Sequence, residues 1–244
     1  VQGPRSKVQG PRSKVQGRRG FTFAFNPQSA VPNPQSKNFR LPTSPPLAST
    51  PPVIDRYSLP EMRALWTEQR KLEIWLEIEV LACEGMAKIG AIPKEDAAEI
   101  RAKAAFDIET VRENEKRTNH DVIAFLEDVA THVGAPSRWI HQGLTSSDLL
   151  DTTLAVQMNA ACGILLDDLI KLREVIAKRA IEHKFTPMIG RSHGIHAEPI
   201  TFGLKMGLMY DEFSRAIERL EEMRVRIRVG KVSGAVGTHA HLDP

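Results

Sequence analysis

The longest uninterrupted helical pattern in the chain runs through residues 145–183, TSSDLLDTTLAVQMNAACGILLDDLIKLREVIAKRAIEH. Apolar residues recur along it at helical spacing, and a lone glycine, Gly163, is its one weak point. The opening letters, TSSD, place hydroxyls first and an acid at the end, which is typical of a helix N-terminus. A helix from Ser147 to His183 would be about 55 Å long at ~1.5 Å per residue, far above the globular average.

A second long helix is predicted beyond this one. Pro199 should open it, and it should reach about Val229, just before Gly230. The connecting segment Phe185–Glu198 contains two glycines and two histidines, and we interpret it as a loop. No convincing alternation with a period of two residues occurs. We therefore expect an all-α fold with long antiparallel helices of an elongated bundle.

Shorter helices are predicted nearer the N-terminus. Residues 58–61, SLPE, have the pattern of a capping box with Pro just inside the helix, which should end near Gly90. Pro93 should open a short helix to about Ala105. A third helical stretch should run over residues 121–133 and stop at the glycine that follows.

These patterns divide the chain into three parts. We assign residues 1–52 to a Pro-rich basic tail, residues 53–145 to an N-terminal helical domain, and residues 146–244 to the first part of a central long-helix bundle. This bundle is expected to be incomplete. In the tail the heptapeptide VQGPRSK occurs twice in succession, and prolines cluster after it. Such a segment cannot bury enough apolar surface to offset the entropy of ordering, so we expect disorder.

Charge separates the tail from the rest of the chain. Residues 1–54 contain eight Lys and Arg and no acid, which leaves 25 of the 33 bases against all 30 acids in residues 55–244. The positive charge is therefore not a nucleic-acid footprint of the folded part, and no nucleic-acid partner is expected. An acid-poor leader with Ser and Arg also resembles an organellar transit peptide, with accidental upstream translation as the alternative.

The two cysteines suggest a reducing compartment. Cys83 and Cys162 both lie in apolar helical surroundings, which argues against a disulfide framework. No apolar run reaches the ~18 residues of a membrane span. We expect a cytoplasmic location, with no membrane partner.

Histidines mark the segments that could carry chemistry. His120, His141, His193 and His196 lie in polar or glycine-flanked segments that punctuate the predicted helices. Imidazole suits proton transfer near neutral pH, and helix N-termini offer free backbone N–H groups to anions. The pattern favours acid–base chemistry on a carboxylated or phosphorylated substrate.

A metal site is the competing interpretation of one of these segments. His193, His196 and Glu198 lie close together in sequence, but the two histidines are three residues apart, Gly194 intervenes, and no Cys is near. Helical zinc sites of the His-Glu-x-x-His type space their histidines by four. We therefore expect no metal, and a nucleophilic role for either cysteine is disfavoured as well.

Five sequence blocks, taken in order, resemble the adenylosuccinate lyase family of the fumarase/aspartase superfamily. They are IDRYSLPEM at 54–62, NHD at 119–121, HQGLTSSD at 141–148, RSHGIHAEP at 191–199 and KVSGAVGT at 231–238. The resemblance is continuous over residues 53–244, and Ser192 replaces a family Thr while keeping the hydroxyl. The GLTS letters alone would indicate only the superfamily, in which a cycloisomerase branch is the nearest competitor.

The resemblance implies an activity and a role for each matching residue. The family eliminates fumarate from adenylosuccinate, giving AMP, and from the succinylated aminoimidazole carboxamide ribotide of purine biosynthesis. It implies a general acid at His193, with His120 and His141 orienting the substrate and able to share the proton work. The substrate-binding residues that it implies are Arg56 and Tyr57 on the phosphate side, Asn119, His120 and Asp121 in the pocket, and Thr145 and Ser146 on a succinyl carboxylate. No cofactor and no metal is implied.

The resemblance also implies a homotetramer in which three subunits build each active site. The family's catalytic Ser lies on a mobile loop containing Met-Pro-x-Lys, a sequence that does not occur in these 244 residues. We therefore expect this chain to be inactive alone. The alternatives are another lyase or cycloisomerase of the superfamily, or a non-catalytic helical fragment that only oligomerises.

Overall fold

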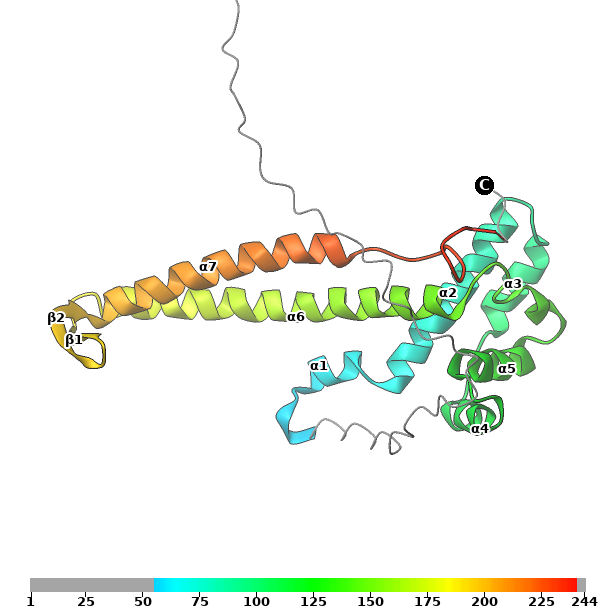
Figure 1. Cartoon of the computed structure of the whole chain (residues 1–244), viewed down its shortest axis with the longest axis horizontal. Coiled ribbons are helices and arrows are strands. Elements are labelled where there is room, and N and C mark those ends of the chain that lie inside the picture. Colours follow the sequence, from blue (N-terminus) through cyan, green and yellow to red (C-terminus); the bar gives the residue numbers. More distant parts are fainter. Residues whose placement is uncertain (1–54, 241–244) are drawn as a thin grey trace, which may run out of the picture. The chain divides into compact units, whose positions relative to one another are not determined.

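The computed structural model describes residues 55–240, which belong to the second of the two units into which the chain divides, 1–52 and 53–244. The tail predicted to be disordered lies outside the described residues. The described elements, in order, are η1 (Asp55–Tyr57), α1 (Pro60–Leu65), α2 (Glu68–Lys88), α3 (Lys94–Lys103), α4 (Ile108–Thr118), α5 (Asp121–Val133), η2 (Ala135–Trp139), α6 (Ser146–Glu182), β1 (Pro187–Ser192), β2 (Ile195–Thr201) and α7 (Phe202–Ile227) (Figure 1). Helices dominate, as predicted.

A compact apolar core holds the shorter helices together. It combines buried side chains of α2, α3, α4 and α5 with Leu149 from the start of α6. Trp75 and Phe125, both fully buried, meet edge to face with ring centroids 5.6 Å apart. Burial of this apolar surface holds the helices in place, and so it also positions the segments between them next to the first turn of α6.

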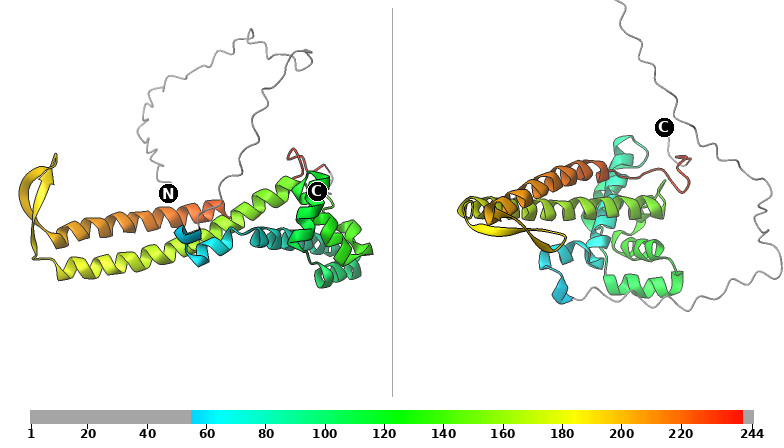
Figure 2. Two further views of the ribbon diagram at one scale, coloured as in Figure 1. Left: turned by 90° about the horizontal axis from the view of Figure 1, so that it is seen from below. Right: turned by 60° about the vertical axis from the view of Figure 1, so that its left-hand side comes forward.

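The two long helices form an antiparallel pair. Helix α6 runs from Ser146 to Glu182, within one residue of the predicted bounds at each end, and Thr145 and Asp148 form a capping box at its start. Helix α7 returns alongside it (Figures 1 and 2). Gly203, at the start of α7, permits a close approach, because a Cβ there would lie 2.5 Å from the carbonyl oxygen of Ala180.

A β-hairpin joins the long helices where a loop was predicted. Strands β1 and β2 pair antiparallel, with Ser192 opposite Ile195, and form the one sheet found within residues 55–240. The two residues between them, His193 and Gly194, have φ angles of 52° and 80°, as a two-residue turn of type I′ requires. Pro199 lies in β2, so α7 begins at Phe202 rather than at the predicted proline.

The first predicted helix is divided in two. Helix α1 ends at Leu65, and α2 starts afresh with Thr67 as N-cap, whose hydroxyl accepts a hydrogen bond from the Arg70 N–H (3.1 Å). The N-cap position of α1 falls on Leu59, one residue after the predicted Ser58. The end near Gly90, the short helix after Pro93 and the helix ending before Gly134 are confirmed.

Helix α4 escaped prediction because its sequence, IETVRENEKRT, has only two large apolar residues, Ile108 and Val111. Val111 is its one buried residue. Its start is nevertheless marked by Asp107, whose carboxylate accepts a hydrogen bond from the Thr110 N–H (2.8 Å).

Helix α6 also has the length and composition of a membrane-spanning helix, with a mean hydropathy of 1.4 over its most apolar stretch. It is the one such helix within residues 55–240, although no single apolar run was found in the sequence. Core helices of soluble proteins also have this length and composition, so one such helix is weak evidence for a membrane. About a third of that stretch is buried here, against neighbouring helices.

Candidate active site

The N-terminus of α6 is the centre of the candidate site. Thr145 and Ser146, predicted to bind a carboxylate, lie at its N-cap and first position and are half-buried. The first backbone N–H groups of a helix lack partners within the helix and favour an anion. Two hydroxyls at such a terminus can add hydrogen bonds to a bound carboxylate.

Asp148 anchors this helix start from behind. Its side chain is fully buried, accepts a hydrogen bond from the Thr145 N–H (2.9 Å), and forms an ion pair with Lys231 (Nζ to Oδ1, 2.6 Å). The N–H groups of Ser233 and Gly234 donate to the same carboxylate at 3.1 and 3.2 Å. The segment that follows α7 is thereby fastened to the first turn of α6.

These contacts determine how Asp148 titrates. Burial alone would raise the pKa of its carboxyl group. The hydrogen bonds from Lys231 and from the backbone N–H groups of Ser233, Thr145 and Gly234 outweigh burial and hold the pKa below its usual range. Asp148 therefore stays ionised and keeps its hydrogen bonds at neutral pH.

His120 lies beside Ser146, although 26 residues separate them in sequence. It is the N-cap of α5, and its Nδ1 accepts a hydrogen bond from the Ile123 N–H (3.4 Å). With Nδ1 used as an acceptor, the neutral ring carries its proton on Nε2. That nitrogen lies 3.4 Å from the Ser146 Oγ, so His120 donates toward the start of α6.

The neighbours of His120 shape the turn that carries it. Asn119 ends α4 in the left-handed conformation (φ 50°), which Asn tolerates better than most residues. Asp121 opens α5, and its Oδ1 accepts a hydrogen bond from the Val122 N–H (2.8 Å). Both residues flank His120 at the surface, on the segment that faces Ser146.

His141 is held by a carboxylate that sequence analysis missed. Glu79 of α2 is 1% exposed; its Oε2 accepts a hydrogen bond from the His141 backbone N–H (2.8 Å), and its Oε1 lies 2.6 Å from His141 Nδ1. The sequence did contain a signal for Glu79. It lies at helical spacing from Leu72, Trp75 and Cys83, so it shares an otherwise apolar face of the helix with them. A buried acid on such a face needs a partner.

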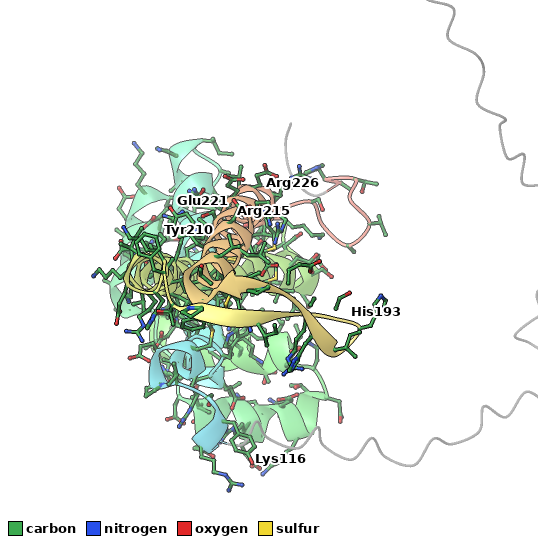
Figure 3. All side chains as sticks on the ribbon, turned by 90° about the vertical axis from the view of Figure 1, so that its left-hand side faces the viewer. Lys116, His193, Tyr210, Arg215, Glu221 and Arg226 are labelled. Carbon is green, nitrogen blue, oxygen red and sulfur yellow. The ribbon has the colours of Figure 1, made fainter. Side chains whose placement is uncertain are left out.

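His193 lies far from the other two histidines. It occupies the tip of the β-hairpin, exposed and projecting away from the helices (Figure 3). Helix α6 separates this hairpin from the turn that carries His141, and its 37 residues span about 55 Å at ~1.5 Å per residue. Within one chain, the predicted general acid does not meet His120, His141 or Ser146.

Arg56 and Tyr57 lie apart from both the α6 N-terminus and the hairpin tip. The Arg56 guanidinium donates to the Tyr57 hydroxyl (3.2 Å) and stacks over its ring, and Tyr57 is 72% exposed. Tyr57 lines a groove of about 580 Å³ with Leu165, Asp168 and Lys171 of α6. These positions are more than four helical turns beyond Ser146, so Arg56 and Tyr57 do not contact the α6 N-terminus.

Cys83 is buried on α2 and forms no disulfide. Desolvation by burial, and then the charges of Glu79 and Glu84, raise the pKa of Cys83 to about 12, so its thiol stays protonated at neutral pH. Residues 55–240 contain no group of three or more His, Cys, Asp or Glu side chains placed to hold a metal ion.

Known proteins are similar to this chain in sequence and in fold. A family model described as Lyase matches residues 56–244. The adenylosuccinate lyase of Bacillus subtilis is 50% identical over 192 residues, which are 79% of this chain and 44% of that protein.

Solved structures agree with this relationship. A fumarate lyase from Mesorhizobium sp. BNC1 has a TM-score of 0.71 at 32% identity, covering 74% of this chain and 43% of its own. A β-carboxy-cis,cis-muconate cycloisomerase from Acinetobacter calcoaceticus has a TM-score of 0.69 at 25% identity, covering 74% and 44%. The chain spans less than half the length of each of these relatives. With the family model matching most of its residues, the chain belongs to the lyase family of the fumarase/aspartase superfamily.

Proposed function

We propose that this chain supplies part of the active site of an adenylosuccinate lyase, which eliminates fumarate from adenylosuccinate and from the succinylated aminoimidazole carboxamide ribotide. One observation carries the proposal. His120 Nε2 and Ser146 Oγ lie 3.4 Å apart at the N-terminus of α6, in a chain 50% identical to an adenylosuccinate lyase. An anion site beside a proton-carrying ring is what elimination from a succinyl group requires.

The α6 N-terminus would bind the succinyl carboxylate next to the carbon that loses its proton. When a base removes that proton, negative charge moves onto this carboxylate. Hydroxyls of Thr145 and Ser146, together with the free N–H groups of the helix, would stabilise the charge as it develops. The electron pair then forms the carbon–carbon double bond of fumarate as the carbon–nitrogen bond breaks, and the leaving nitrogen takes up a proton.

His193 is our candidate for the acid that protonates this nitrogen. Its distance from Ser146 within one chain means that the two can serve one site only if they come from different subunits. We propose a homotetramer in which each site combines the hairpin of one chain with the α6 N-terminus of another. Arg56 and Tyr57, at their own location, would bind the phosphate from a further chain.

Exposed apolar side chains along the long helices support the assembly. Leu154, Leu165 and Leu172 of α6 and Leu204 and Leu208 of α7 are between 42% and 65% exposed. Side chains of this kind on adjoining faces are expected to be covered by a partner. Further helices in a multi-chain bundle would cover them, and cytoplasmic conditions would suit the free thiols of the described residues.

A chimera tests the proposal. Residues 53–244 replace the matching part of the Bacillus subtilis relative, so that the remainder of that enzyme completes the fold. We expect the chimera to form a tetramer and release fumarate from adenylosuccinate, and the 244-residue chain alone to release none. A folded, tetrameric chimera without activity would contradict the proposal, as would robust fumarate release by the isolated chain.

A second candidate is a cycloisomerase or another lyase of the superfamily. The structural likeness to the muconate cycloisomerase, with a TM-score of 0.69, favours testing it. Assaying the chimera with 3-carboxymuconate, argininosuccinate and aspartate, beside adenylosuccinate, separates the candidates. Turnover of adenylosuccinate well above the others supports the first proposal.

A further inference from the structure

Glu79 makes two contacts with one residue, and the two contacts differ in kind. Its Oε2 lies 2.8 Å from the backbone nitrogen of His141, and its Oε1 lies 2.6 Å from the ring Nδ1. The backbone N–H can only donate, so Oε2 must accept. The ring nitrogen can donate or accept, and the carboxylate decides which.

An ionised carboxylate has no proton to give, so Nδ1 of His141 must carry the hydrogen of that short contact. In the neutral ring the other nitrogen, Nε2, is then an unprotonated acceptor. The His141 side chain is 20% exposed, and within residues 55–240 the structure shows no hydrogen bond to Nε2. The nitrogen with the free lone pair is thus available to a ligand.

The backbone reinforces this arrangement. His141 has a φ angle of 65°, in the left-handed region that costs non-glycine residues energy. The Glu79 contact to its N–H helps hold the residue there, and Glu79 itself is buried on the rigid helix α2. Backbone and ring are fixed by the same side chain.

We infer that Glu79 is a positioning residue, which locks the proton of His141 on Nδ1 and so presents Nε2 to the substrate as the atom that accepts a hydrogen bond or a proton. The inference rests on the proposed function for its catalytic consequence, because it refines the role of His141 in that site. When the ring is neutral, the substrate group next to His141 Nε2 is expected to be a hydrogen-bond donor, an N–H or an O–H.

Glu79→Gln tests this without removing an atom from the core. The His141 N–H still demands an acceptor, so the amide oxygen must face it and the amide NH2 must face the ring. Nδ1 then becomes the acceptor, and the proton moves to Nε2. The variant keeps both hydrogen bonds and inverts the tautomer, so we expect it to fold.

The direct measurement is ¹⁵N NMR of the histidine rings in the 244-residue chain at alkaline pH, where imidazoles are neutral. Loss of one signal set in His141→Gln assigns the ring. We expect protonated Nδ1 in the unmodified chain and protonated Nε2 in Glu79→Gln. Glu73→Gln, on the exposed face of the same helix, should change neither. Protonated Nε2 in the unmodified chain, or an unchanged ring in Glu79→Gln, would overturn the inference.

Activity of the chimera measures the catalytic consequence. Glu79→Gln should lower kcat by about 10²-fold, the lower end for lost acid–base function, with a smaller change in KM. In a His141→Ala background it should add nothing, because Glu79 acts through that ring. If the losses in kcat from Glu79→Gln and His141→Ala multiply in the double variant, Glu79 has a general structural role instead. If the unmodified chimera has no activity, the proposed function fails, whereas the NMR result on Glu79 still stands or falls separately.

Discussion

Within the segment TSSD at 145–148, Asp148 has a different role from the hydroxyl residues before it. Thr145 and Ser146 are half-buried at the N-terminus of α6, whereas Asp148 is fully buried and accepts hydrogen bonds from Lys231, Ser233 and Gly234. A carboxylate buried without such partners would be strongly unfavourable. The sequence predicts the first role, because a helix start with hydroxyls and an acid is recognisable locally. It does not predict the second, because Lys231 lies 83 residues away.

Asp148→Asn should lower the free energy of unfolding by about 2 kcal/mol at neutral pH, the scale of hydrogen bonds to a charged group. Lys231 is 30% exposed and can reach water, which limits the loss. Because folding depresses the Asp148 pKa, its contribution is fully present above the unfolded pKa of about 3.9 and fades as the pH falls through the folded value.

Urea unfolding at neutral pH and at about pH 3 checks both statements. The difference between the two proteins should be large at the first pH and smaller at the second. Asp151→Asn, on the exposed face of the same helix, is the control and should change little at either pH. An equal difference at both pH values would show that the charge of Asp148 is not what stabilises the fold.

At the scale of elements, prediction succeeded where the signal is local. The capping box of α6 and the glycine that follows α5 marked their helix ends correctly. The β-hairpin was missed because the sequences of its two largely exposed strands, PMIGRS and IHAEPIT, do not alternate between apolar and polar residues. A two-residue His-Gly turn was its one local signal. Helix α4, with Val111 as its single buried residue, packs on α5 and carries exposed ion pairs such as that of Lys116 with Glu113.

The contact between the long helices can be tested at two glycines of α7. At Gly203 a Cβ would lie 2.5–2.7 Å from backbone atoms of Ala180 and Lys184, whereas at Gly207 it would meet nothing within 4 Å. Gly203→Ala should therefore lower the free energy of unfolding by about 1–3 kcal/mol through overpacking. Gly207→Ala should raise it by up to about 1 kcal/mol, since alanine favours the helix. Chemical denaturation of the two variants should give opposite signs; equal signs would mean that the close approach is absent.

At the scale of the whole molecule, the candidate groups are divided among distant positions. His120, His141, Thr145 and Ser146 cluster at one end of α6, and His193 lies beyond the other. The sequence places these candidate groups in order along the chain, but it could not show that no single chain brings them together. The length of α6 determines that separation, and the same length supplies the apolar faces through which several chains can associate.

This separation predicts complementation between two inactive variants of the chimera. His193→Ala and His120→Ala should each lower turnover by about 10²-fold or more, the scale of a lost general acid or orienting ring. When the two are unfolded together and refolded as mixed tetramers, a site can draw its hairpin from a His120→Ala chain and its α6 N-terminus from a His193→Ala chain. Random assembly gives each site an intact hairpin half of the time and an intact α6 terminus half of the time, independently.

About a quarter of the unmodified activity should therefore return, because the symmetry of a closed oligomer makes all sites equivalent. Refolding each variant separately and mixing afterwards is the control and should restore nothing unless subunits exchange. If mixed refolding restores no activity although mixed tetramers form, His193 and His120 must act from the same chain. The chain would then have to bring the ends of α6 together by a rearrangement that its capped, continuous 37-residue helix opposes.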